Sequence, residues 1–480
     1  MHRPPHVLRR NGSVIRLVLS RRHGALLSWA LGIVLGLHGG LAASSVSAAS
    51  SPPKPALTAT ARQAAAFYKS GEYDRVLQLL QSVAPGQEPD REMIRYALLS
   101  QVKLGKPEEA FKLYLRLIPA GQPDDPALLR DVARSFILSR VRDSQEHVRI
   151  AAYTALAEIG DKDTLPLLED GLLDSSALVR ARSAEAIGRS GMAGHSSALK
   201  RTLRDEAPGV RIAAINALSD AKVSGITEQL TEIARIDEGP ESIFALAGLY
   251  KLGRTDVLID ISNAATLPDP EVRMAAIGIL GRLRRPGSLS ILSQAVYDPH
   301  PAVRAFAAGA LGEYGSPEGV APLTHSLGDD NPRVRSVALT SLGRLALPET
   351  RSVIQPLLRD PDEQVRVSAI EAMLRLGDAT AVLNAADLAR HPDPSVRGGT
   401  AQALAVATAP KALTVLESLL KDQQPLPRLM AARALGKSPL STVISPLKLG
   451  LQDSDAAIRI ASAGSLLQAL ARTGKSGSSR

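Results

Sequence analysis

From residue 127 onward the chain repeats with a period of 31 residues, marked by an apolar residue followed by arginine. The marker arginines are Arg149, Arg180, Arg211, Arg273, Arg304, Arg335, Arg366, Arg397, Arg428 and Arg459. In most units an aspartate stands six residues before the marker, at Asp143, Asp174, Asp205, Asp298, Asp329, Asp360, Asp422 and Asp453. A fixed period of this length indicates an architecture in which each unit packs only on its neighbours. We count eleven units between residues 127 and 472.

One unit lacks its marker. Ser242 stands where the repeat requires arginine, although the apolar pattern of the segment PESIFALAGLYKLG continues in register. Three interpretations stay open for this unit: a bend in the stack, a contact with a partner, or drift without consequence.

Each unit reads as two helices. Leu165, Leu168 and Leu172 show the spacing of the first helix, in which steps of three and four residues place apolar side chains on one face. The second helix is rich in alanine, as in VRIAAINAL, so that helices can approach closely. Units ending in glycine, such as Gly160 and Gly315, suit a left-handed helix end. We therefore predict an all-α fold, a right-handed solenoid of helical hairpins forming a continuous rod, roughly 100 Å long at about 10 Å per layer.

The spacing D-x4-V-R resembles the HEAT family, in the short form known from bilin lyases. In that family the Asp and Arg of successive units form a hydrogen-bonded ladder, and the resemblance implies the same role for the marker residues here. A partly exposed ion pair contributes about 0.2–1 kcal/mol, whereas truncating a buried leucine costs roughly 2–5 kcal/mol. The apolar layers therefore hold the stack together, and the ladder mainly fixes the rotation between units.

Residues 58–126 follow a period of 34 instead. Gly71 recurs as Gly105 and Pro85 as Pro119, and the segments SGEYDRVLQLLQ and LGKPEEAFKLYL match as second helices. This pattern resembles the tetratricopeptide repeat, a helix–turn–helix of the same length, although the early tryptophan of that family is missing. The resemblance implies two such repeats, with a capping helix at 126–138.

Residues 1–49 have the order of a secretory signal: a basic segment, an apolar stretch at 25–43, and small residues before a cleavage point after Ala48 or Ala49. The alternative is an uncleaved anchor in the inner membrane. Both place the repeats outside the cytoplasm, most simply in the periplasm. Residues 50–57 read as a linker and residues 473–480 as a disordered tail.

Composition narrows the function. The leader holds six arginines and no acid, so the rest of the chain has 57 − 6 = 51 bases against 48 acids, a charge of about +3. This near-neutral body argues against nucleic-acid binding, which needs a basic stripe. The absence of cysteine excludes disulfides and thiolate metal sites.

No motif predicts catalysis, a cofactor or a metal. The five histidines beyond the leader lie far apart, and none is followed by glutamate, unlike in the iron-binding deoxyhypusine hydroxylases, another HEAT-type family. Two Gly-Lys-Ser segments lack the earlier glycine of a phosphate-binding loop. We therefore predict that the chain is not an enzyme.

A binding surface is predicted from basic residues on the second helices. Arg189, Lys251, Arg282, Arg344, Arg375 and Lys437 stand nine positions after the marker position, with Arg284 and Arg285 nearby. Gly278, Gly281, Gly309 and Gly312 would leave room for a partner backbone. Our hypothesis is a mildly basic groove centred on 273–345 that accepts an acidic or extended segment. The alternative is that these are scattered surface bases.

The function predicted from these patterns is a non-enzymatic scaffold or adaptor that binds proteins in the periplasm or cell envelope. The alternative is a bilin-lyase-like or cofactor-loading assembly factor.

Overall fold

The computed structural model describes residues 58–84, 86–236 and 239–477. The chain divides into two units, residues 1–56 and 57–480, of which the second is described by itself. The predicted leader and linker lie outside the described residues. Within the described part every regular element is a helix, and the predicted all-α solenoid of helical hairpins is confirmed. No helix in this part is long and apolar enough to span a bilayer.

Four helices precede the stack: α1 (Ala59–Lys69), α2 (Tyr73–Gln81), α3 (Arg91–Lys103) and α4 (Pro107–Leu117). The remaining helices follow as α5 (Pro126–Leu138), α6 (Glu146–Ile159), α7 (Leu165–Gly171), α8 (Ala177–Arg189), α9 (Ser197–Arg201), α10 (Pro208–Asp220), α11 (Thr227–Ile236), α12 (Pro240–Lys251), α13 (Leu258–Ala264), α14 (Pro270–Leu283), α15 (Ser288–Ala295), α16 (Pro301–Tyr314), α17 (Val320–Ser326), α18 (Pro332–Leu345), α19 (Arg351–Ile354), α20 (Glu363–Arg375), α21 (Ala381–Leu388), α22 (Pro394–Ala403), α23 (Pro410–Leu419), α24 (Pro425–Lys437), α25 (Ile444–Gly450) and α26 (Ala456–Gly477).

Local sequence sets where these helices begin and end. Proline opens many of the helices that carry the marker position, where its fixed φ suits the first turn and its missing N–H costs nothing. Gly160 and Gly315 end α6 and α16 with φ of +65° and +79°. Arg284 and Ala346 stand at the same position of their repeats and adopt φ of +50° and +52°, a conformation that glycine tolerates better.

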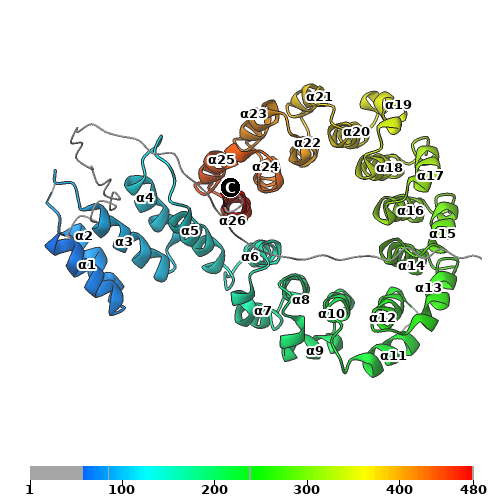
Figure 1. Ribbon diagram of the computed structural model, residues 1–480, viewed down its shortest axis with the longest axis horizontal. Coiled ribbons are helices and arrows are strands. Elements are labelled where there is room, and N and C mark those ends of the chain that lie inside the picture. Colours follow the sequence, from blue (N-terminus) through cyan, green and yellow to red (C-terminus); the bar gives the residue numbers. More distant parts are fainter. Residues whose placement is uncertain (1–57, 85, 237–238, 478–480) are drawn as a thin grey trace, which may run out of the picture. The chain divides into compact units, whose positions relative to one another are not determined.

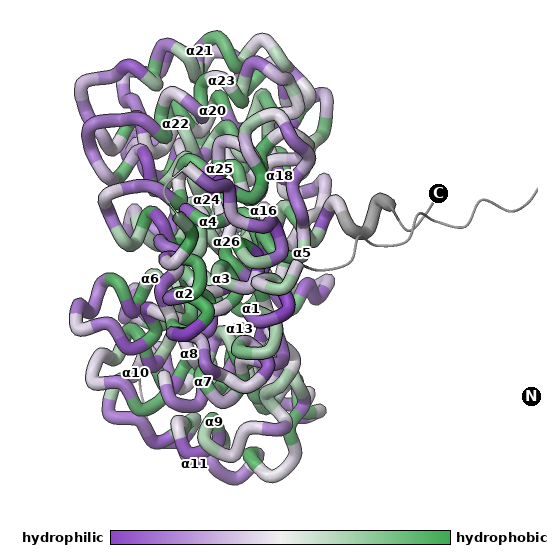
Figure 2. Tube along the Cα trace, turned by 90° about the vertical axis from the view of Figure 1, so that its left-hand side faces the viewer, coloured by the Kyte–Doolittle hydropathy of each residue, from purple (hydrophilic) through white to green (hydrophobic). Residues whose placement is uncertain are grey.

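The helices form two rows within residues 57–480. The even-numbered helices from α6 to α26, here called the inner helices, line the inside of the stack, and the odd-numbered helices from α7 to α25 cover them (Figure 1). One hydrophobic cluster runs from Ile94 to Leu470, built mostly from alanine, leucine, isoleucine and valine. Figure 2 shows hydrophilic and hydrophobic residues alternating along the helices, as expected where one face of each helix packs and the other meets water.

The stack closes on itself, so the continuous rod predicted for the solenoid is corrected to a closed stack. α26 packs against α5 and α6, the first helices of the series. A Cβ added to Gly464 would lie 3.2 Å from the Ala155 Cβ, so the two inner helices are nearly in backbone contact there. We call this contact the seam. The rotations at the ten joints between the eleven inner helices add up until the last unit meets the first, and this sum is not visible in any single repeat.

The end of the chain also differs from the prediction. α26 continues to Gly477, beyond the start of the predicted tail at residue 473. The Arg472 guanidinium donates hydrogen bonds to the carbonyl oxygens of Gly436 and Ser438, which fastens the last turns of α26 to the end of α24.

Candidate functional site

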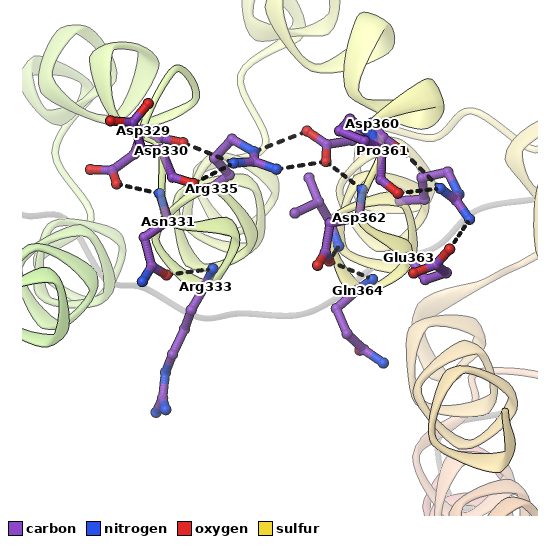
Figure 3. A network of polar contacts seen from close by, with 12 residues as sticks. Asp329, Asp330, Asn331, Arg333, Arg335, Asp360, Pro361, Asp362, Glu363 and Gln364 are labelled. Atoms are coloured by element: carbon purple, nitrogen blue, oxygen red, sulfur yellow. Dashed lines mark hydrogen bonds and ion pairs between the residues drawn. The ribbon is translucent and has the colours of Figure 1, made fainter.

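The marker residues form a polar ladder along the stack. Arg335 Nε and Nη2 donate to the Asp360 carboxylate at 2.9 and 2.8 Å, and its Nη1 donates to the Asp329 carbonyl oxygen at 2.9 Å (Figure 3). Asp360 also accepts from the Asp362 N–H at 2.9 Å, which fixes the turn before α20. The same two-pronged pair joins Arg149 to Asp174, Arg180 to Asp205, Arg273 to Asp298, Arg304 to Asp329, Arg397 to Asp422 and Arg428 to Asp453.

These pairs shift the titration of the carboxyl groups. Hydrogen bonds from Arg304 lower the pKa of Asp329, and those from Arg397 lower the pKa of Asp422, in both cases against the burial that raises it. The carboxylates therefore stay charged at neutral pH, and each fixes one unit to the next through a planar guanidinium.

The ladder is interrupted at two joints between inner helices. Ser242 has no guanidinium, and Leu267 stands where its aspartate would be, so the arginine and its partner are missing together. Arg211 is held by Glu241 instead, with Nε 2.6 Å from the carboxylate. At the second interruption His391 stands where Arg366 would find an aspartate, and Arg366 binds Glu363 of its own helix at 3.1 Å and the Asp360 carbonyl oxygen at 2.7 Å.

At the seam the ladder continues through different residues. Arg459 lies 3.3 Å from Glu108 of α4, Glu108 binds Arg140 at 3.0 Å, and Arg140 binds Asp143 at 3.2 Å. Arg149 then donates to the Asp143 carbonyl oxygen. Lys448 Nζ also lies 2.7 Å from Asp124 Oδ1. The seam is therefore held by both an apolar contact and a polar chain that sequence spacing did not reveal.

The glycines predicted to leave room for a partner divide into two groups. A Cβ on Gly312 would lie 2.5 Å from the Ser341 Cβ, and one on Gly281 would lie 2.8 Å from the Ala310 carbonyl oxygen. For these two glycines the prediction is wrong, because the next inner helix fills the space. Gly278 has nothing within 4 Å of an added Cβ, and Gly309 has only Val337 Cγ1 at 3.5 Å, so the space above these two is open.

The predicted basic residues also divide into groups that differ in their contacts. Lys251 forms an ion pair with Asp220, and Arg375 binds Glu371 at 2.8 and 3.0 Å, so both charges are locally compensated. Arg284 donates to the Glu313 carbonyl oxygen at 3.0 Å, and the Arg285 guanidinium lies 5.7 Å from the centre of the Tyr250 ring. Arg189 and Lys437 are exposed on α8 and α24, and neither lines the pocket described next.

Arg282 and Arg344 meet at one pocket of about 490 Å³ on the inner helices. We call it the basic pocket. Its apolar wall is formed by Phe244 of α12, Met274 of α14, Phe306 of α16 and Val337 of α18, and Gly278 and Gly309 also line it. Arg333 lies at its edge, and Figure 3 shows the Arg333 side chain pointing away from the ladder.

Sequence reasoning missed Arg333 and the two phenylalanines. All lie two residues from a marker position, on the helix face shared by the positions five and nine after it. Steps of four, three and four residues share a helical face, so this pattern could have identified the pocket. Among the described residues no group of three or more His, Asp or Glu side chains is placed to hold a metal ion.

Comparisons with known proteins agree with this repeat structure. The family model for HEAT repeats matches residues 121–188, 170–247, 255–338, 327–405 and 383–468. No curated protein matches the chain.

Three solved structures show weaker likeness. Human deoxyhypusine hydroxylase in complex with glycerol is 18% identical with a TM-score of 0.30, covering 52% of this chain and 98% of its own. The YibA protein of Escherichia coli is 18% identical with a TM-score of 0.29, covering 62% and 97%. Kap121p is 12% identical with a TM-score of 0.34, covering 78% of this chain and 51% of its own. At these TM-scores no likeness extends to function. The family model covers more than half of the sequence, and the chain therefore belongs to the HEAT repeat family.

Proposed function

We propose that this chain is a non-enzymatic scaffold that binds other proteins outside the cytoplasm and receives acidic or extended segments on its inner helices. A HEAT repeat solenoid is a protein-interaction fold, because its stacked helices expose a long surface without a reactive pocket. The observation that carries the proposal is the placement of Arg282, Arg333 and Arg344 around one open apolar pocket on that surface.

The four N-terminal helices support a second part of the proposal, a pair of tetratricopeptide-like repeats. α1 pairs with α2 and α3 with α4 through turns in which Gly71 and Gly105 adopt φ of +79° and +68°. The export part rests on the leader sequence alone, and the inner-membrane anchor stays its alternative. A reporter enzyme that is active only outside the cytoplasm, fused after residue 57, tests it: activity supports export, and an inactive fusion overturns it.

The alternative function, a bilin-lyase-like or cofactor-loading factor, rests only on the short repeat form. Fold likeness does not fix function, and bilin attachment belongs to an internal compartment, which conflicts with export. A bilin absorption spectrum in the purified protein would favour this alternative over the scaffold.

Site-specific photo-crosslinking in living cells tests the scaffold proposal. A photoreactive amino acid replaces Gln402, which is exposed on the inner helix α22, or Leu383, which is exposed on the outer helix α21. We expect protein adducts from position 402 and few from position 383. Adducts from position 383 alone, or from neither position, would overturn the assignment of the inner face as the binding surface.

A further inference from the structure

The floor of the basic pocket is made of glycines that the packing does not require. A glycine in the middle of a helix is less stable there than an alanine would be. Gly281 and Gly312 have a packing reason, because the next helix touches them. Gly278 has none, and Gly309 meets only one side chain at ordinary contact distance. The open space above them lies on the exposed side of α14 and α16, where it can accept an atom from outside the chain.

The wall of the pocket is apolar and exposed. Phe306 keeps 46% of its surface accessible, on a protein in which only 3% of residues are aromatic. Phe244, Met274 and Val337 are partly buried around the same volume. The volume of this concave apolar pocket, about 490 Å³, lies in the range of pockets that bind small ligands or anchor side chains.

The rim carries a local excess of positive charge. Arg282, Arg333 and Arg344 line the pocket together with one acid, Glu313, which leaves a formal charge of 3 − 1 = +2. The structure shows no ion pair for these three arginines among residues 58–84, 86–236 and 239–477. The Arg282 guanidinium lies 5.8 Å from the centre of the Phe244 ring, which orients it by a cation–π contact. Arg282 and Arg344, which have no ion pair within the described part of the chain, thus gather with Arg333 at one apolar hollow.

We propose that this pocket docks a protein segment in which an apolar side chain, aromatic or leucine-like, is flanked by carboxylates. The apolar side chain fills the space over Gly278 and Gly309 against Phe306, and the carboxylates pair with Arg333 and Arg344. Guanidinium groups match carboxylates through two parallel hydrogen bonds, and the opposite charges select an acidic segment over a basic one. This inference rests on the proposed function and names the chemistry of its partner.

Binding of short labelled peptides to the full chain tests the proposal. The first probe is a fluorescein-labelled peptide with a leucine-phenylalanine core and two glutamates on each side. Two matched peptides replace the glutamates by lysines or the core by two alanines. We expect fluorescence anisotropy to show binding of the first peptide only, weakened by added salt because charges at an exposed rim are screened.

Three variants locate the site. Gly278→Leu fills the open space and Arg344→Glu reverses a rim charge, and each is expected to weaken binding of the first peptide at least about tenfold. Lys437→Glu makes the same charge change at the equivalent position of α24, away from the pocket, and is expected to leave binding unchanged. A thermal unfolding curve for each variant is the control that it is folded.

Equal binding of the three peptides, or equal loss with Lys437→Glu and Arg344→Glu, would overturn the pocket. Tight binding of dodecanoate without binding of the acidic peptide would assign the pocket to a fatty acid instead and would also overturn the proposal. If the first peptide does not bind but position 402 still gives protein crosslinks, only this inference is overturned. If neither peptide binding nor crosslinking from position 402 is observed, the proposed scaffold function is overturned as well.

Discussion

The three joints between the inner helices α14, α16, α18 and α20 are held together differently from the two joints that flank them, although all five are built from one repeat. Within α14 to α20 each joint has a glycine eight positions after the marker, at Gly281, Gly312 and Gly343, and a complete Arg–Asp pair. At the α12–α14 and α20–α22 joints that position is Tyr250 or Leu374, and the pair is missing. These two joints also have the least extensive contacts between consecutive inner helices.

The difference shows that close packing and the ladder occur together. A large side chain between two inner helices holds them farther apart. An arginine on one helix then no longer reaches an aspartate 25 positions later on the next unit. The two interrupted joints divide the circuit of inner helices into two arcs. The basic pocket lies across the α12–α14 joint and extends to α18, so it occupies one end of the closely packed arc.

The largest expected effect comes from filling a close joint. Gly312→Leu places side-chain atoms where the Ser341 Cα would already be 2.8 Å from a Cβ, and backbone cannot yield easily. We expect the free energy of unfolding to fall by about 1–3 kcal/mol. Gly278→Leu, on the adjacent helix but facing open space, is the control and is expected to raise stability by up to about 1 kcal/mol. Equal melting temperatures for the two variants would contradict the packing comparison.

Removing a ladder arginine is expected to have the next largest effect. Arg335→Met leaves Asp360 without its two charged hydrogen bonds and should cost about 1.5–3 kcal/mol. Arg366→Met removes the same contacts to backbone carbonyls but no inter-unit carboxylate, and should cost under about 1 kcal/mol. Urea unfolding of both variants measures the difference. If Arg366→Met proves as costly as Arg335→Met, the ladder pair contributes nothing of its own.

Protonation of one ladder aspartate at low pH is expected to weaken its joint, and this effect is smaller than that of removing a ladder arginine. Hydrogen bonds from Arg304 lower the pKa of Asp329 in the folded chain, while an unfolded aspartate titrates near about 3.9. The stabilisation is therefore fully present above about pH 4 and is lost as the pH falls toward the lowered folded value. Melting temperatures between pH 6 and pH 3 should fall more steeply for the wild type than for Asp329→Asn, which does not titrate. Parallel curves would show that this pair does not couple to stability.

The smallest expected effect lies at the seam. Glu108→Gln weakens the polar chain between Arg459 and Arg140, both partly exposed, and should cost about 0.2–1 kcal/mol. Hydrogen exchange followed by mass spectrometry should show faster exchange in α26 with no change in α14 to α20. Glu109→Gln on the same helix, which removes an exposed pair with Lys112, is the control. Equal exchange in α26 for the two variants would remove Glu108 from the seam.

Sequence reasoning reached the helical pairs because their signals are local. The apolar spacing, the terminal glycines and the marker residues all lie within one unit, and each constrains the backbone where it stands. It failed at Gly281 and Gly312, because the sequence does not say whether the neighbour of a small residue is a partner or the next helix. It missed Arg333, because that arginine matters only beside Phe306, which lies on α16 in the preceding unit of the stack.

By itself the sequence determined that the chain is a stack of helical pairs with a period of 31 residues, because the period and the apolar pattern repeat in every unit. Only the tertiary structure decided that the stack closes, that Glu108 substitutes for a ladder acid at the seam, and which basic residues share a pocket. The closure depends on rotations summed over ten joints, the seam on residues more than 300 positions apart, and the pocket on side chains from four inner helices. No local pattern records such a sum, because each joint constrains only its two neighbours.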